Sequence, residues 1–143
     1  MKKVFMALLM FCGGTVLVKA QTVKESQVPA AVKSALKSKY AEAKGVQWEK
    51  EKGNYEANWG GKSKEDNSVQ FTPSGEFIEI VKAIPVSQLP APVLSYVKAH
   101  YKGAKITEAG KVTDAKGKMS YEAAVNKKDI IFDEKGNFVK AED

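Results

Sequence analysis

Apolar and polar residues follow one periodicity, change to a second, and then repeat the whole arrangement. From residue 28 to residue 43 an apolar side chain recurs about every four positions, with lysines between. This spacing predicts a helix with one apolar stripe, which begins at Pro29 and ends near Lys44 and Gly45. The stripe consists of Val28, Val32, Leu36, Tyr40 and Ala43.

After Gly45 the period shortens to two residues, which predicts strands. The turn-forming residues Gly, Asn, Pro and Ser separate four expected strands, at 46–51, 55–59, 69–71 and 77–81. Residues 60–68 form a polar loop between the two hairpins. The segment from Gln21 to Gln27, ahead of the helix, is expected to be a short flexible lead.

The same succession of elements returns 61 residues later. Residues 28–40 match residues 89–101, and the spacing Phe-x-x-x-Gly-x-Phe at Phe71 returns at Phe132. Tyr55-Glu56-Ala57 returns as Tyr121-Glu122-Ala123 at an offset of 66, so one hairpin loop differs by about five residues. An internal repeat of this length indicates one supersecondary unit used twice. The second unit is therefore expected to contain a helix from Leu89 to about Gly103 and strands at 106–112, 120–125, 129–132 and 137–141.

These elements predict an α+β fold, a tandem repeat of a helix plus a four-stranded antiparallel sheet. We expect one bent sheet of about eight strands with two helices on one face. Repeat one spans 28–84 and repeat two spans 89–141, within one domain of residues 21–143. An antiparallel sheet can leave its second face to solvent, so function is sought on that face.

Residues 1–20 have the features of a secretory signal peptide. Lys2 and Lys3 precede an apolar run from Val4 to Val18, and the segment Val18-Lys19-Ala20, which ends in a small residue, resembles a cleavage site before Gln21. The run is too short and wrongly flanked for a spanning helix, although an uncleaved N-terminal anchor is the alternative. Cys12 follows bulky residues, so it does not fit a lipidation signal. A periplasmic or secreted protein without stable membrane insertion is expected.

The charge and the cysteine content indicate which partners the protein can bind and how its fold is stabilised. Removal of the signal peptide lowers the net charge from +6 to +3, and the chain contains no Arg. Nucleic-acid readers depend on Arg for bidentate contacts, so nucleic acid is not an expected partner. The mature chain has no Cys, so packing alone must hold the fold.

The residues needed for catalysis are scarce. His100 is the only histidine and lies on the second helix, with neither a nucleophile nor an orienting partner indicated. Gly61-Lys62-Ser63 resembles the end of a phosphate-binding loop, but Glu56 stands where the earlier glycine is required. No cofactor is expected. Asp66 and Asp133 are weak calcium candidates, and ordinary solvated turn acids are the simpler interpretation.

The aromatic residues are the candidate partner-binding residues: Trp48, Tyr55, Trp59 and Tyr121. If their sheet face meets the helix they form the core, and if it faces solvent they are natural anchors for a protein. The opposite phase of the first two strands carries an acidic stripe: Gln47, Glu49, Glu51, Glu56 and Asn58.

In its signal peptide, its Pro-Ala-x-Val…Tyr helix, its Tyr-Glu-Ala strand and its Phe-x-x-x-Gly-x-Phe turn, used twice, the chain resembles the PepSY-like family. These are small exported bacterial proteins described as beta-lactamase-inhibitor-like. The resemblance covers Val28 to Ala141 and implies the tandem helix-plus-sheet unit and a concave sheet as binding surface. It carries no binding residue across, and this chain lacks the disulfides of the secreted beta-lactamase inhibitor.

Two functions are therefore carried forward. The first is a non-enzymatic protein that binds a protein partner, in the envelope or outside the cell, through its sheet face and the 60–68 loop, as a protease- or hydrolase-inhibitor-like module. The second is a periplasmic sensor of calcium or a small ligand. A hydrolytic enzyme is a distant third, because the required side-chain pairs are missing.

Overall fold

A computed structural model describes residues 20–142 of the chain. The predicted signal peptide, apart from Ala20, and Cys12 lie outside the described residues. Contacts divide the chain into unit 1, which ends at Ile80, and unit 2, which begins at Val81. The elements in order are β1 (Gln21–Val23), η1 (Glu25–Gln27), α1 (Ala30–Lys39), β2 (Gln47–Glu51), β3 (Asn54–Trp59), β4 (Asn67–Phe71), β5 (Phe77–Ile84), η2 (Val86–Gln88), α2 (Ala91–His100), β6 (Ile106–Asp114), β7 (Met119–Val125), β8 (Lys128–Asp133) and β9 (Phe138–Glu142).

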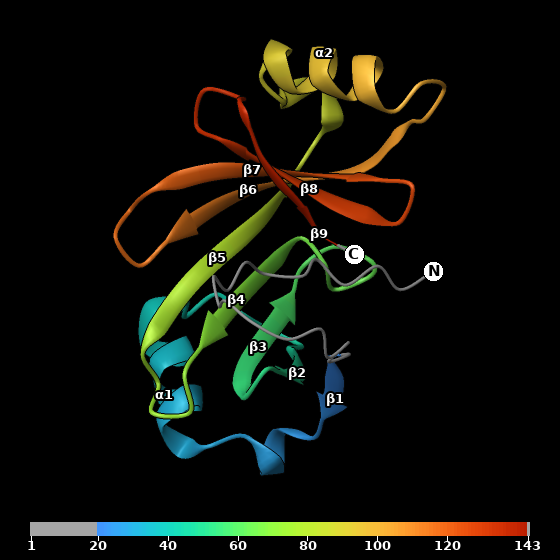
Figure 1. Ribbon diagram of the computed structural model, residues 1–143. Helices are drawn as coiled ribbons and strands as arrows, with labels where there is room; N and C mark the ends of the chain where they lie inside the picture. Colours follow the sequence, from blue (N-terminus) through green and yellow to red (C-terminus); the bar gives the residue numbers. More distant parts are fainter. Residues whose placement is uncertain (1–19, 143) are drawn as a thin grey trace. The chain divides into compact units, whose positions relative to one another are not determined.

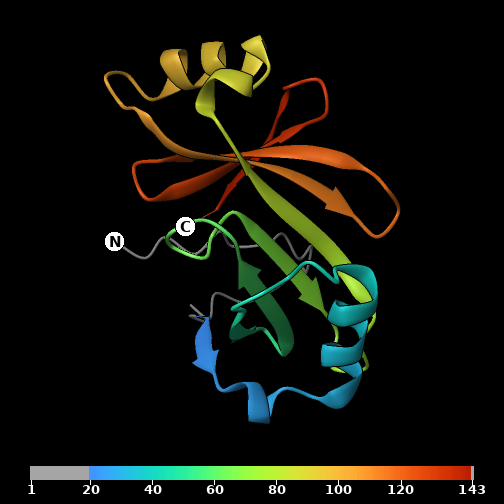
Figure 2. The ribbon, with the colours of Figure 1, turned by 180° about the vertical axis from the view of Figure 1, so that it is seen from behind.

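In unit 1, α1 packs on one face of the antiparallel strands that follow it (Figures 1 and 2). The strand register places Trp48 opposite Ala57, and Tyr55 opposite Phe71. These residues lie on the face that meets the helix, because side chains alternate between the two faces of a strand. The α1-facing core of buried residues is Val28, Val32, Leu36, Trp48, Tyr55, Ala57, Trp59, Val69, Phe71 and Ile80.

Unit 2 repeats this construction with α2 against its own strands. Tyr121 pairs with Phe132, and Ala123 pairs with both Ala109 and Ile130 across three antiparallel strands. The α2-facing core of buried residues is Leu89, Val93, Val97, Ala109, Ala123, Val125, Ile130 and Phe132. Each unit therefore has its own apolar core under its own helix.

The repeated Phe-x-x-x-Gly-x-Phe spacing forms a turn that touches the start of the helix. Gly75 has φ +87°, and a Cβ added there would lie 2.7 Å from the Ala31 carbonyl oxygen of α1. Gly136 has φ +86°, and its added Cβ would lie 3.1 Å from the Pro90 side chain ahead of α2. Glycine is needed at both positions, since the backbone is left-handed and a neighbour occupies the space of a side chain.

The predicted α+β class and antiparallel sheet are confirmed, with nine strands instead of about eight, in the order β1 to β9. The prediction of a flexible lead at 21–27 was wrong, because β1 and the 3-10 helix η1 occupy all of it except Lys24. Gln21 pairs with Lys50, and Val23 pairs with Trp48, so β1 adds a short strand to the edge of β2. Three residues are too few to show a period of two, so the sequence pattern could not reveal this strand.

The predicted helix ends were also wrong by several residues. α1 ends at Lys39 and α2 at His100, and the next residue, Tyr40 or Tyr101, has left the helical conformation. The Tyr40 ring packs against Trp59, with ring centroids 5.5 Å apart. The helix ends where its aromatic residue turns onto the sheet, several residues before the glycine that looked like its stop.

Candidate functional site

The aromatic candidates pack the interior of their units. Trp48 and Trp59 are 4% and 5% exposed, and Tyr55 is also buried in the α1-facing core. Tyr121 is half-buried and packs against the α2-facing core. These rings were expected either in the core under the helix or on a solvent-facing sheet surface. In the structure they lie in or against the core, so neither tryptophan offers an exposed anchor. Their role in partner binding stays a prediction.

The weak calcium candidates lie in turns. The Asp133 carboxylate accepts backbone N–H bonds from Lys135 and Asn137, at 2.9 and 2.8 Å, and a third bond from the Asn137 side chain at 2.9 Å. These bonds to Asn137 are the main reason that the pKa of Asp133 is lowered. Asp66 lies beside Gly60 and Gly61 in the polar loop. Within residues 20–142 no group of three or more His, Cys, Asp or Glu residues could hold a metal ion.

His100 takes part in an aromatic stack on the surface of unit 2. Its ring lies 3.9 Å from the Tyr96 ring at 17°, and Tyr96 in turn stacks on Phe138 at 4.7 Å. His100 Nδ1 lies 2.9 Å from the Tyr96 carbonyl oxygen. At the equivalent place in unit 1, Lys39 Nζ lies 4.4 Å from the centre of the Phe77 ring. The geometry gives His100 a role in stacking with Tyr96.

The strands of unit 1 carry a concentration of carboxyl and amide side chains on the face opposite α1. Side chains on this phase alternate with those of the α1-facing core along β2, β3, β4 and β5. We call this set of side chains the acidic face: Gln47, Glu49, Glu51, Glu56, Asn58, Ser68, Gln70 and Glu79. Gln47 is exposed, Glu49 and Asn58 are half-buried, and the other five are buried. The sequence pattern found its first five positions and missed Ser68, Gln70 and Glu79.

Glu56 lies at the centre of the acidic face. It is 2% exposed and stands on the middle strand β3, opposite Glu49 of β2 and Gln70 of β4. Gln70 Nε2 donates a hydrogen bond to Glu56 Oε2 at 3.4 Å. Burial raises the pKa of Glu56 to about 7 and the charge of Glu49 adds to the rise, while the Asn58, Ser68 and Gln70 side chains oppose it.

Unit 2 has the equivalent carboxylate in a different setting. Glu122 of the second Tyr-Glu-Ala sequence is fully buried. Its cross-strand neighbours are Gly110 and Ile131, where Glu56 has Glu49 and Gln70. The repeat therefore keeps the central glutamate, and only unit 1 surrounds it with polar side chains from both neighbouring strands.

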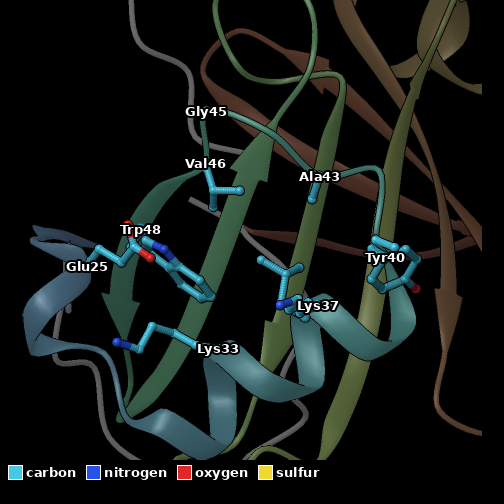
Figure 3. Close-up of a pocket in the computed structure, with 10 residues that line it drawn as sticks. Glu25, Lys33, Lys37, Tyr40, Ala43, Gly45, Val46 and Trp48 are labelled. Carbon is cyan, nitrogen blue, oxygen red and sulfur yellow. The ribbon is translucent and has the colours of Figure 1, made fainter.

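Unit 1 also has an open groove of about 500 Å³ between the helix and the start of β2 (Figure 3). Lys33 and Lys37 of α1 lie on one side, and Val46 and Trp48 lie on the other. Glu25 stands at one end. The groove is a mixed surface with an apolar floor and charged edges.

The equivalent groove of unit 2 has a volume of about 540 Å³. Val97, Lys98 and Tyr101 occupy the positions of Leu36, Lys37 and Tyr40, 61 residues apart. Val86 and Leu94 replace the charged residues Glu25 and Lys33 of the first groove. The repeat therefore keeps the groove and one of its lysines, and it replaces two charged residues of the edge with apolar ones.

The fold and these surfaces define a class of small α+β proteins built from two helix-plus-sheet units. The family described as "Putative beta-lactamase-inhibitor-like, PepSY-like" matches residues 15–62 and 59–140. The chain therefore belongs to this family. No curated protein sequence matches the chain.

Solved structures share the fold at low sequence identity. A protein of Bacteroides eggerthii, described as periplasmic, is 24% identical with a TM-score of 0.69, over 80% of this chain and 88% of that one. A DUF2874 family protein of Bacteroides uniformis is 23% identical with a TM-score of 0.67, over 79% and 87%. A BLIP-like protein of Bacteroides fragilis is 20% identical with a TM-score of 0.62, over 80% and 86%. The predicted periplasmic or secreted location agrees with the description of the first. No helix within residues 20–142 is long and apolar enough to cross a membrane.

Proposed function

We propose that this protein is an exported, non-enzymatic binding protein that recognises another protein through the acidic face of unit 1. The observation that carries the proposal is the charge of this face. Four glutamates, Glu49, Glu51, Glu56 and Glu79, share it, although the mature chain has a net positive charge. Such a concentration of one sign steers and orients a partner of the opposite sign.

Two further observations support a binding role over catalysis. His100, the one histidine, is engaged in a stack with Tyr96 and Phe138. The family description and the BLIP-like neighbour point toward inhibitor-like proteins, which act by occupying a surface of an enzyme. A protease or hydrolase of the envelope, with a basic surface, is the partner that fits this combination.

The test is recovery of a partner from envelope extract with the mature chain, residues 21–143, as bait. A variant with Glu49→Lys reverses the charge of a half-buried residue of the acidic face. A control variant, Glu76→Lys, makes the same change at an exposed turn position. We expect one protein in near-equal amount with the wild type and the turn variant, and its loss with the face variant. Equal recovery with all three baits would refute the proposed surface.

The groove of unit 1 supports the small-ligand alternative. Its apolar floor and its lysines suit an amphiphile with an acidic head group. A thermal-shift screen of such compounds with the wild type and Lys37→Gln tests this alternative. A compound whose stabilisation disappears in the variant would favour the sensor over the protein-binding function.

A further inference from the structure

We infer that the groove of unit 2 docks a segment of a protein partner in which an apolar side chain lies between acidic ones. The groove has a volume of about 540 Å³ and lies between α2, the loop that follows it and the start of β6 (Figure 1). It is a second binding surface, independent of the acidic face, so the inference goes beyond the proposed function. Three features carry it: exposed apolar surface, unpaired lysines, and a long stretch of chain without acids.

The first feature is apolar surface that extends from the interior of unit 2 to the edge of the groove. Val86, Tyr101 and Ile106 are half-buried, and they both pack against the α2-facing core and line the groove. Leu94 of α2 continues this surface outward and is 40% exposed, although the solvent side of a surface helix usually carries polar residues. An apolar side chain of a partner would lose contact with water here on several sides, which favours its binding.

The second feature is positive charge without a counter-charge. Lys98 and Lys105 line the groove and are exposed, and no Asp or Glu lines it. Among residues 20–142 neither ammonium group has an ion-pair or hydrogen-bond partner. Lys98 lies in the last turn of α2, where the helix dipole favours a positive charge. Lys105 lies beyond the helix, so the dipole does not account for it.

The third feature is the composition of the chain around the groove. Residues 80–107 contain no Asp or Glu, although the whole chain has 17. They contain four lysines: Lys82, Lys98, Lys102 and Lys105. The equivalent segment of the first repeat, residues 19–46, contains Glu25 and Glu42, and Glu25 lines the first groove. Because a local excess of one sign attracts the opposite sign, the second groove favours an acidic ligand.

A protein segment fits this groove better than a lipid does. Sites for small ligands bury most of the ligand surface, and this groove is open to solvent, so it would leave much of a free fatty acid exposed. A flat bilayer would reach Leu94 but not Val97 or Ile106, which are buried and half-buried. An apolar floor with charged groups at the edge is the usual composition of a protein interface, and the rest of the partner would cover the groove from outside.

The experiment uses the ¹⁵N-labelled mature chain and three peptides with blocked ends. Gly-Glu-Leu-Glu-Gly carries the proposed pattern, Gly-Lys-Leu-Lys-Gly reverses its charge, and Gly-Glu-Ser-Glu-Gly lacks its apolar side chain. The backbone amide signals of Gly103 and Ile106 report on the groove of unit 2. Those of Gly45 and Val46 report on the groove of unit 1 in the same spectrum.

Two pairs of variants test the lysine and the apolar side chain separately. Lys105→Glu reverses a charge at the edge of the groove, and Lys116→Glu makes the same change on the exposed β6–β7 turn. Leu94→Gln removes the exposed apolar side chain, and Met119→Gln removes one that is 36% exposed outside the groove. All four positions are exposed, so the fold should be retained, and the amide spectrum of each variant checks this.

We expect the Glu-Leu-Glu peptide to move the Gly103 and Ile106 signals more than those of Gly45 and Val46. Both other peptides should bind more weakly. Lys105→Glu and Leu94→Gln should each weaken binding about fivefold, since an exposed ion pair and the partial burial of one leucine are each worth about that factor. Lys116→Glu and Met119→Gln should bind like the wild type.

The inference is overturned if the Gly103 and Ile106 signals do not move, if the Lys-Leu-Lys peptide moves them equally, or if Lys105→Glu binds like the wild type. Decanoate or phosphatidylglycerol vesicles are titrated in parallel. If either moves these signals more strongly than the Glu-Leu-Glu peptide does, a lipid is the ligand of the groove and the protein segment is excluded.

This outcome is separable from the fate of the proposed function. Glu49 lines neither groove, so Glu49→Lys should bind the peptide like the wild type. If this variant loses its partner in the envelope capture while the peptide leaves Gly103 unmoved, the proposed function stands and the inference fails. If the peptide binds and all three baits recover the partner equally, the groove is a binding site and the acidic face is not.

Discussion

Replacement of Glu56 by Gln should change how the stability of the protein depends on pH. Glu56 is buried at the centre of the acidic face, and its pKa in the folded protein is about 7 against an ordinary value of 4.5. Because the folded state holds this proton more tightly than the unfolded state, the stabilising effect of protonation is complete below pH 4.5. It is lost as the pH rises through 7.

The size of the effect follows from the two pKa values. Between pH 4.5 and pH 8 the wild type should lose about 3 kcal/mol through this one group. Gln cannot ionise, so Glu56→Gln lacks this loss. The difference in unfolding free energy between variant and wild type should therefore move by about 3 kcal/mol in favour of the variant over this range.

Urea unfolding of both mature chains at pH 4.5, 6, 7 and 8 measures that difference. Other carboxyl groups titrate in both proteins and largely cancel from it, apart from those that interact with Glu56 directly. Glu76→Gln serves as the control, because Glu76 lies exposed on a turn away from the acidic face. A free-energy difference for Glu56→Gln that stays constant with pH, or one that moves against the variant, would show that Glu56 is not held protonated by burial.

Four other outcomes are expected from the structure. Gly75→Ala should destabilise unit 1 by more than about 1 kcal/mol, while Gly53→Ala, also left-handed but with open space around it, should cost only about that amount in the same urea assay. His100→Ala should leave partner recovery unchanged and lower stability slightly, because it removes one exposed stack. Asp133→Ala should be destabilising at neutral pH, and the difference should shrink in acid as the wild-type carboxyl, with its lowered pKa, takes up its proton. Calorimetric titration with calcium should show no heat of binding, and saturable binding lost on substitution of Asp66 would contradict this.

The internal repeat made most of the fold predictable. An apolar period of about four residues, followed by a period of two, occurs twice along the chain at an offset of about 61 residues. This repeated pattern was sufficient to predict both helices and eight of the nine strands. The ends of the helices were not predictable in the same way. Tyr40 continues the apolar stripe in the sequence, but its ring is bound by Trp59 and Phe77 of the sheet, and such contacts are invisible to periodicity.

The acidic face could be predicted from the sequence pattern only in part. Alternation along the first two strands placed Glu49 and Glu56 on one side, because each lies between core residues. Ser68 was assigned to a loop, since the polar run before it hides the start of β4. The bond between Gln70 and Glu56 depends on the register of β3 and β4, which the sequence does not specify across the seven-residue loop between them.

The glycine turns also bear on the order of folding. Gly75 touches Ala31, 44 residues earlier, and Gly136 touches Pro90, 46 residues earlier, whereas each hairpin joins residues that are close along the chain. Local pairings close small loops and form first, and contacts of long sequence separation form after them. Each helix should therefore dock late, after the hairpins exist. A substitution at Gly75 should then accelerate unfolding and leave the refolding rate almost unchanged, with a φ-value near zero.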